Sequence, residues 1–295
     1  MNAGQPHPRL TLLGGQVDLI TPGEMLRFVD VVAEAGGSAV IANHNGHSLF
    51  LMRRDRTLRA FFDEADVIQI DSTPMIAWGA LLGLPVGRRH RSTYLDWRQD
   101  FWRLANARRW RVFYLGGAPG IAQKASHKLA QAWPNVTLGV HHGYFDTAPA
   151  ACANRKVVAR IAAFAPDILF VGMGMPRQEQ WINDNRSAFE RGVIFSVGAA
   201  FDYEAGAQPI PPRWTGRLGL EWLYRLIGQP RRLGPRYLFE PWALIPAAGR
   251  DLAAVFAPRL LGRSLDGRRF APSPAPRPQS NRSRNRQCRT SPAAR

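Results

Sequence analysis

Cysteine and long apolar runs are scarce in this chain of 295 residues. Its two cysteines, Cys152 and Cys288, are too few for a disulfide framework and lack the spacing of metal ligands. The longest apolar stretch, residues 75–87, contains Pro85 and falls short of the roughly 20 residues of a membrane-spanning helix. The N-terminus has no basic segment followed by an apolar one, as a signal peptide would. These absences predict a cytoplasmic protein.

Several nucleotide and metal motifs are also missing. Arg177 stands where a dinucleotide fingerprint beginning at Gly172 and Gly174 would need its third glycine, and the turn at residues 116–120 has the wrong spacing. There is no Walker A sequence, and no two aspartates are separated by a single residue. The sequence therefore predicts neither a cofactor nor a metal, and it disfavours a nucleotide-dependent oxidoreductase.

Negative charge is sparse towards the C-terminus, and this explains the net charge of +17. Residues 263–295 contain nine arginines and one aspartate, and residues 211–262 contain eight arginines against three acidic residues. Residues 263–295 are also rich in Pro and Ser, which predicts disorder. An alternative function, nucleic-acid binding through this tail, would give salt-dependent affinity. The tail lacks interleaved aromatic residues and the body lacks a nucleic-acid motif, so we expect no nucleic-acid partner.

Short β-branched runs alternate with segments of helical period, which predicts an α/β fold with a Rossmann-like, mostly parallel sheet flanked by helices. The strands are expected at residues 38–42, 65–70, 111–115, 136–140, 167–171 and 193–197. We expect a flexible N-terminus over residues 1–13, an α/β domain over 14–208, a basic helical appendage over 209–262 and a disordered tail over 263–295. Thr21 and Glu24 have the spacing of a capping box that begins a helix.

Polar residues follow the predicted strands, where ligands bind in open α/β sheets. Asp71 follows the second strand and is placed either to act as a general base or only to accept backbone hydrogen bonds in its turn. Thr73 is the expected N-cap of the next helix, with Pro74 at its first position. The glycine-rich turns at residues 116–120 and 172–174 could approach a phosphate or could simply be tight turns.

Arginines and aromatic residues alternate over residues 213–237, where six arginines face one acidic residue, Glu221. Guanidinium groups suit phosphate oxygens, and Trp and Tyr suit a membrane interface. The alternative interpretation is a solvated charged face with aromatic residues in the core.

These motifs together resemble one family over residues 14–250. They include Asn-His-Asn at 43–45, RSTYLDW at 91–97, VFYLGGAPG at 112–120, PDILFVGMGMPRQEQW at 166–181, VGAAFDYEAG at 197–206 and the stretch from Pro211 to Tyr237 with its GLEW and PRR elements. The family is the WecG/TagA/CpsF glycosyltransferases, family 26.

The resemblance implies metal-independent, inverting transfer of a sugar from a UDP-sugar to a polyprenyl-diphosphate-linked saccharide at the inner membrane surface. It implies catalytic roles for Asp71 as general base, Arg91 and Gln178. We assign substrate binding to Asn43, Asn45, Thr93, Asp96, Gly116, Gly117, Gly172, Gly174, Pro176 and Glu179, and contact with the donor diphosphate to Arg225, Arg231 and Arg232. Peripheral membrane association and a possible homo-oligomer follow from the same resemblance.

Three positions depart from the family pattern: Asn43 replaces a threonine, while Ser72 and Tyr94 each replace a glycine. These positions are expected near the sugars. The variant pattern ANHNGHSLFL at 42–51 with STYLDW at 92–97 resembles the branch of xanthan and acetan β-1,4-glucosyltransferases, so glucose is the expected donor sugar and exopolysaccharide the expected product. The alternative is transfer of N-acetylmannosamine or its uronic acid to N-acetylglucosaminyl-diphosphate-polyprenol.

Overall fold

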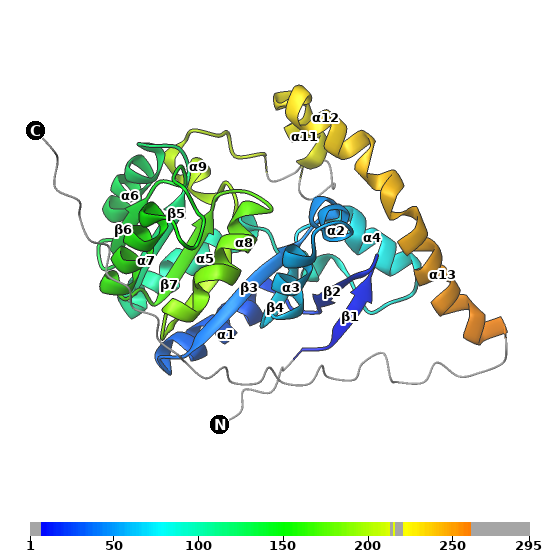
Figure 1. The fold of residues 1–295 in the computed structure, drawn as a ribbon. Helices are drawn as coiled ribbons and strands as arrows, with labels where there is room; N and C mark the ends of the chain where they lie inside the picture. Colours follow the sequence, from blue (N-terminus) through cyan, green and yellow to red (C-terminus); the bar gives the residue numbers. More distant parts are fainter. Residues whose placement is uncertain (1–6, 213–214, 216–220, 261–295) are drawn as a thin grey trace, which may run out of the picture.

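The computed structural model describes residues 7–212, 215 and 221–260. Its centre is a six-stranded sheet in which every neighbouring pair of strands is parallel, in the order β4-β3-β8-β7-β5-β6 (Figure 1). The strands are β3 (Ser38–His44), β4 (Val67–Ile70), β5 (Arg111–Gly116), β6 (Thr137–His141), β7 (Ile168–Gly172) and β8 (Gly192–Ser196). Each overlaps a strand predicted from the sequence, so the α/β prediction is confirmed.

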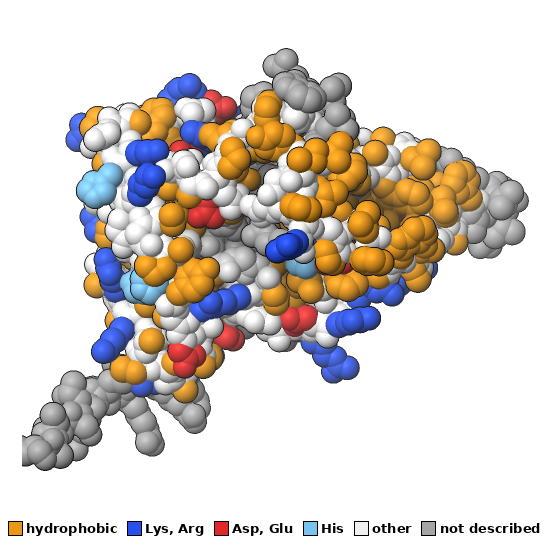
Figure 2. Space-filling view, turned by 90° about the horizontal axis from the view of Figure 1, so that it is seen from above, with side chains coloured by type: hydrophobic (Ala, Val, Ile, Leu, Met, Phe, Trp, Pro, Cys, Tyr) orange, Lys and Arg blue, Asp and Glu red, His pale blue; other side chains and the backbone are white. Residues whose placement is uncertain are grey.

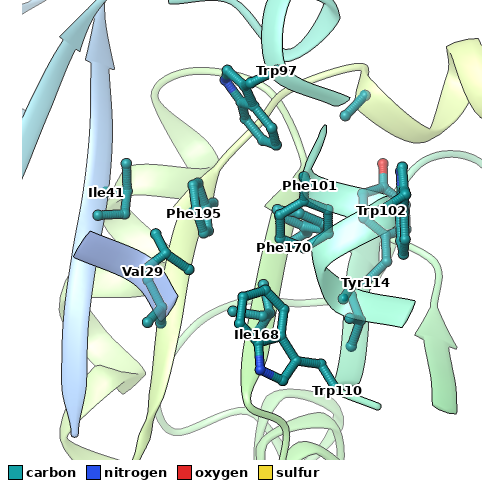
Figure 3. Close-up of a cluster of buried hydrophobic side chains, with 14 of the residues drawn as sticks. Val29, Ile41, Trp97, Phe101, Trp102, Trp110, Tyr114, Ile168, Phe170 and Phe195 are labelled. Carbon is teal, nitrogen blue, oxygen red and sulfur yellow. The ribbon is translucent and has the colours of Figure 1, made fainter. Parts of the chain in front are cut away.

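One face of the sheet packs against an aromatic-rich layer. The helices on this face are α1 (Pro22–Glu34), α5 (Tyr94–Arg108), α6 (Ile121–Ala132) and α9 (Ala200–Ala205). Phe101 and Trp102 of α5 meet Phe170 of β7 and Phe195 of β8 in the buried cluster drawn in Figure 3. Burial of such large rings contributes strongly to stability.

The opposite face carries α2 (Gly46–Met52), α3 (Arg56–Asp63), α7 (Cys152–Phe164) and α8 (Arg177–Asn185). Short 3-10 turns lie at η1 (Arg88–His90) and η2 (Arg186–Ala188). Phe61 and Phe62 of α3 and Trp181 of α8 are almost fully buried against this side of the sheet. The sheet is therefore covered on both faces, as parallel sheets require.

The first strands correct the expected N-terminal boundary. We expected residues 1–13 to be flexible, but β1 (Arg9–Leu12) pairs antiparallel with β2 (Gly15–Asp18). Leu12 is fully buried, and Arg9 forms a buried bidentate ion pair with Asp18, whose Oδ2 also accepts the backbone N–H of Ile68 at 2.7 Å. The ion pair joins β1 to β2, and the hydrogen bonds from Ile68 to Asp18 and from Arg9 to the carbonyls of Ala65 and Asp66 fasten the hairpin to β4 and the turn before it.

Two helix starts test the predicted caps. Thr21 and Glu24 form the predicted capping box at α1. Helix α4 (Thr73–Leu81) is capped by Ser72, whose Oγ accepts the N–H of Met75, and not by Thr73 as expected. The cap lies one residue earlier because Thr73 already has helical geometry.

The expected appendage, residues 209–262, is non-helical over 209–212 and largely helical over 221–260. It comprises α11 (Glu221–Gly228), α12 (Pro230–Leu238), η3 (Glu240–Leu244) and the long helix α13 (Ile245–Leu260), which runs along the edge of the body near α2 and α4 (Figure 1). Val255 of α13 packs with the β1–β2 hairpin and α4. The predicted tail, 263–295, lies outside the described residues. Within the part of the chain that is described, no helix has the length and apolarity to cross a membrane.

Candidate active site

The carboxyl ends of β3 and β4 bring the first two candidate residues together. His44 of β3 pairs with Ile70 of β4, and the N–H of Asp71 donates to the carbonyl of His44 at 2.8 Å. This register carries Asn45 and Asp71 to matching positions just beyond two neighbouring strands. Asp71 is half-buried and directly follows β4 at the carboxyl edge of the sheet.

Arg91 reaches the same edge by a different route. A parallel bridge pairs it with Ile70, and the N–H of Ser92 donates to the carbonyl of Ile70 at 2.9 Å. Arg91 therefore lies beside the residue that precedes Asp71, as the assignment of both to one site requires. A carboxylate and a guanidinium at one strand end can remove a proton and stabilise negative charge.

Thr93 and Asp96 serve the helix that follows. Asp96 Oδ2 accepts from the N–H of Thr93 at 3.1 Å and from its Oγ1 at 2.9 Å, at the start of α5. Asp96 Oδ2 also lies 3.2 Å from Nη1 of Arg91. In the structure both residues fix the start of α5, and Asp96 also holds Arg91. Their predicted contact with substrate stays a prediction.

Asn43 bridges the strands on either side of the topological switch point. The loop after β3 leads to α2 on one face of the sheet, and the loop after β8 leads to α9 on the other. Asn43 Nδ2 donates to the carbonyl of Ser196 in β8 at 2.8 Å. Ligands bind at such crevices in open α/β sheets, which agrees with the placement of Asp71 and Asn45.

Gln178 joins two turns of the site. Its Oε1 accepts the N–H of Gly174 at 3.1 Å and that of Gly198 at 3.2 Å, and its Nε2 donates to Glu179 Oε1 at 2.7 Å. Both side chains are buried, and burial raises the pKa of Glu179 to about 7. The structure thus makes Gln178 a positioning residue for the turns after β7 and β8. Direct contact of Gln178 or Glu179 with substrate stays a prediction.

The glycine turns have a packing reason. A Cβ on Gly116 would lie 2.3 Å from the carbonyl oxygen of Gly172, and a Cβ on Gly172 would lie 2.3 Å from that of Gly198. Gly117 and Gly174 have positive φ values of 67° and 80°, which favour glycine. These four glycines are therefore explained by tight turns and close strands. Their predicted contact with a phosphate stays a prediction, as does that of Pro176, the residue before α8.

Two appendage residues that were not predicted as site residues contact the first βα turn of the site. Arg236 of α12 donates to Asn45 Oδ1 at 3.2 Å, and His47 Nδ1 lies 2.8 Å from an oxygen of Glu240 in η3. Burial and the neighbouring Arg236 lower the pKa of His47, whereas Glu240 opposes this shift. Arg236 belongs to the arginine-rich stretch noted above, but a contact across 191 positions cannot be inferred from spacing.

Of the three arginines predicted to contact the donor diphosphate, the structure describes the side chain of one. Arg231 is exposed on α12, and the side chains of Arg225 and Arg232 lie outside what the structure describes. Their roles therefore remain predictions. Among the described residues, no group of three or more His, Cys, Asp or Glu side chains could hold a metal ion.

A family model confirms the resemblance noted in the sequence. The model of the glycosyl transferase WecG/TagA/CpsF family matches residues 10–254. The chain belongs to this family. It is therefore an enzyme, a hexosyltransferase, built on an α/β sheet with an appendage.

Two similar proteins come from Staphylococcus aureus strains MW2 and NCTC 8325 / PS 47. Each is 29% identical over 236 residues, which cover 77% of this chain and 87% of the relative. Both carry the name N-acetylglucosaminyldiphosphoundecaprenol N-acetyl-beta-D-mannosaminyltransferase. That name gives both the transferred sugar and the acceptor of these relatives.

Proposed function

We propose that this enzyme transfers an N-acetylmannosamine-type sugar from a UDP-sugar to an N-acetylglucosaminyl-diphosphate-polyprenol. The names of the two staphylococcal relatives support this choice of sugar and acceptor. The observation that carries the catalytic assignment is the meeting of Asp71, Asn45 and Arg91 at the carboxyl edge of β3 and β4.

The proposed reaction is a single displacement. The acceptor hydroxyl oxygen attacks the anomeric carbon and forms the new glycosidic bond, while Asp71 takes the hydroxyl proton. The bond between the anomeric carbon and the diphosphate oxygen breaks on the opposite face, which inverts the anomeric configuration, and UDP leaves with the bonding electrons. Arg91 and appendage arginines would stabilise the charge that develops on the diphosphate without a metal ion.

The three positions that depart from the family pattern, Asn43, Ser72 and Tyr94, form hydrogen bonds within the protein. Ser72 caps α4, and Asn43 Nδ2 donates to the carbonyl of Ser196. The hydroxyl of Tyr94 donates to Glu204 at 2.7 Å and accepts from Trp102 Nε1 at 3.0 Å. All three departures from the family pattern thus make contacts within the protein, and the support for the N-acetylmannosamine-type sugar comes from the names of the relatives.

A donor and acceptor panel tests the proposal. UDP release would be measured with UDP-N-acetylmannosamine, its uronic acid and UDP-glucose, each against N-acetylglucosaminyl- and glucosyl-diphosphate lipids, with EDTA present. We expect turnover with the N-acetylmannosamine donor and the N-acetylglucosaminyl lipid. Turnover confined to UDP-glucose and the glucosyl lipid would instead establish the glucosyltransferase, and a strict metal requirement would contradict the arginine-based mechanism.

Asp71→Asn tests the general base. Because asparagine cannot take the proton, turnover should fall by about 100-fold or more, while binding of the UDP-sugar measured by calorimetry remains. Asp100→Asn is the matched control, since Asp100 is exposed on α5 and forms an ion pair with Arg103 three residues further along the helix. Activity of Asp71→Asn close to that of Asp100→Asn would remove Asp71 from this role.

We also propose that the appendage binds the membrane surface peripherally. Large apolar side chains of the appendage are exposed, among them Leu238 at 59%, Phe239 at 71%, Trp242 at 69% and Ile245 at 56%. Apolar side chains gather over the C-terminal helices at the right of Figure 2. Such a surface suits an enzyme whose acceptor is anchored in lipid.

A further inference from the structure

Arg91 is shared by two carboxylates from distant parts of the chain. Its Nη1 lies 3.2 Å from Asp96 Oδ2, and its Nη2 donates to Glu221 Oε2. The Arg91 side chain is 11% exposed, and those of Asp96 and Glu221 are 19% and 15% exposed. Water therefore screens this cluster less than it would an ion pair on the surface.

The two carboxylates are held very differently. Asp96 is fixed by two hydrogen bonds from Thr93 at the first turn of α5, within the α/β body. Glu221 is the first residue of α11 and reaches Arg91 from 130 positions further along the chain. An incoming ligand could displace Glu221 by moving α11, whereas displacing Asp96 would break the start of α5.

The two carboxylates around Arg91 disfavour binding of an anionic ligand such as a diphosphate. At neutral pH one guanidinium and two carboxylates carry a net charge of −1. A diphosphate that approached Arg91 with both carboxylates in place would meet repulsion from the nearer of them. Once Glu221 leaves, Asp96 still holds Nη1 of Arg91, and the N–H donors at Nη2 become available to phosphate oxygens.

We propose that Glu221 occupies Arg91 in the ligand-free enzyme and that the diphosphate of a substrate takes its place. This inference rests on the proposed function, because that function makes the ligand a diphosphate. Binding would then release the start of α11, while Arg236 and Glu240 still tie α12 and η3 to the first βα turn through Asn45 and His47. Glu221 thus sets the affinity of the site for anions and couples substrate binding to the position of α11.

The test uses inorganic pyrophosphate as the probe and isothermal calorimetry as the measurement. Glu221→Gln keeps the size of the side chain and removes its charge, so pyrophosphate should bind about 3- to 10-fold more tightly than to the wild type. Glu240→Gln is the matched control, since it removes one charge from the same appendage but from a residue that pairs with His47. Its affinity should stay within about twofold of the wild type.

A double-mutant cycle makes the test specific for Arg91. Glu221→Gln added to Arg91→Gln should change pyrophosphate affinity by less than about twofold, because the pair is already broken. The inference is overturned if Glu221→Gln binds pyrophosphate no better than the wild type, if Glu240→Gln gives the same gain, or if none of these proteins binds it. The sugar transfer is judged separately by turnover, so either idea can fail while the other stands.

Discussion

Gln178 and Glu179 show how one pair of side chains can fix two turns of a site. An ionised carboxylate only accepts hydrogen bonds, so Glu179 Oε1 directs Nε2 of Gln178 towards itself. Gln178 Oε1 then accepts the N–H groups of Gly174 and Gly198. Glu179 Oε2 is buried without a hydrogen-bond partner among the described residues. Ionisation of Glu179 is therefore costly, although the charged form suits the amide of Gln178.

This cost predicts a pH dependence of stability. Burial raises the pKa of Glu179 from 4.5 to about 7, so between these values the folded protein holds a proton that the unfolded chain lacks. Stability should fall as the pH rises through this range, by up to about 3 kcal/mol from this residue. Glu179→Gln should lose that dependence and gain stability relative to the wild type above pH 7.

Chemical denaturation at pH 5, 6, 7 and 8 measures the effect. Glu190→Gln serves as the control, because Glu190 is exposed in the next loop. If Glu179→Gln and the wild type lose stability in parallel as the pH rises, the carboxylate of Glu179 is not the group responsible.

The carboxyl ends of the strands determine how far apart the turns of the site lie. The carboxyl ends of β5, β7 and β8 approach so closely that Gly116 and Gly172 leave no room for a Cβ. The sequence is compatible with these glycines either binding phosphate or forming tight turns, and the structure gives them a packing role. A glycine can allow the backbone to approach a phosphate, or it can allow two neighbouring strands to approach each other. The sequence pattern alone cannot distinguish these two roles.

Gly172→Ala tests this packing role. Its methyl group would meet the carbonyl oxygen of Gly198 at 2.3 Å, so the free energy of unfolding should fall by about 1–3 kcal/mol. Gly249→Ala in α13 has no neighbour within 4 Å of the new Cβ and should raise stability by about 0.5–1 kcal/mol through helix propensity. Urea denaturation compares the two variants. Equal stability of Gly172→Ala and the wild type would show that the turn relaxes freely.

The secondary-structure elements show which features of the fold can be predicted from the sequence. The six core strands and the Asp71 turn follow from apolar runs, each followed by a polar residue or a glycine, and all six runs overlap strands. The β1–β2 hairpin was missed because the hydrogen bonds that hold it beside β4, from Arg9 to the carbonyls of Ala65 and Asp66 and from Ile68 to Asp18, join residues 50 or more positions apart. The same holds for Glu221, Arg236 and Glu240, whose partners lie more than a hundred positions away.

The whole molecule combines an almost neutral α/β body with an appendage that is basic and exposes apolar side chains. Residues 211–262 hold eight arginines against three acidic residues, while Phe239, Trp242 and Ile245 are all more than half exposed. Arginines attract anionic lipids, and aromatic side chains insert at the headgroup level. The same helices contact the site through Arg236 and Glu240, so membrane binding and the state of the site should be linked.

Removing two aromatic side chains tests whether this surface binds membranes. Phe239→Ser with Trp242→Ser should lower flotation with vesicles of anionic phospholipid at least about tenfold, because each ring would otherwise bury apolar area in the interface. Tyr144→Ser is the matched control, since Tyr144 is 67% exposed on the body and Trp242 is 69% exposed on the appendage. Added salt should weaken binding of the wild type by screening its arginines. Undiminished flotation of the double variant would exclude Phe239 and Trp242 as the principal contacts and leave the basic side chains to bind the membrane.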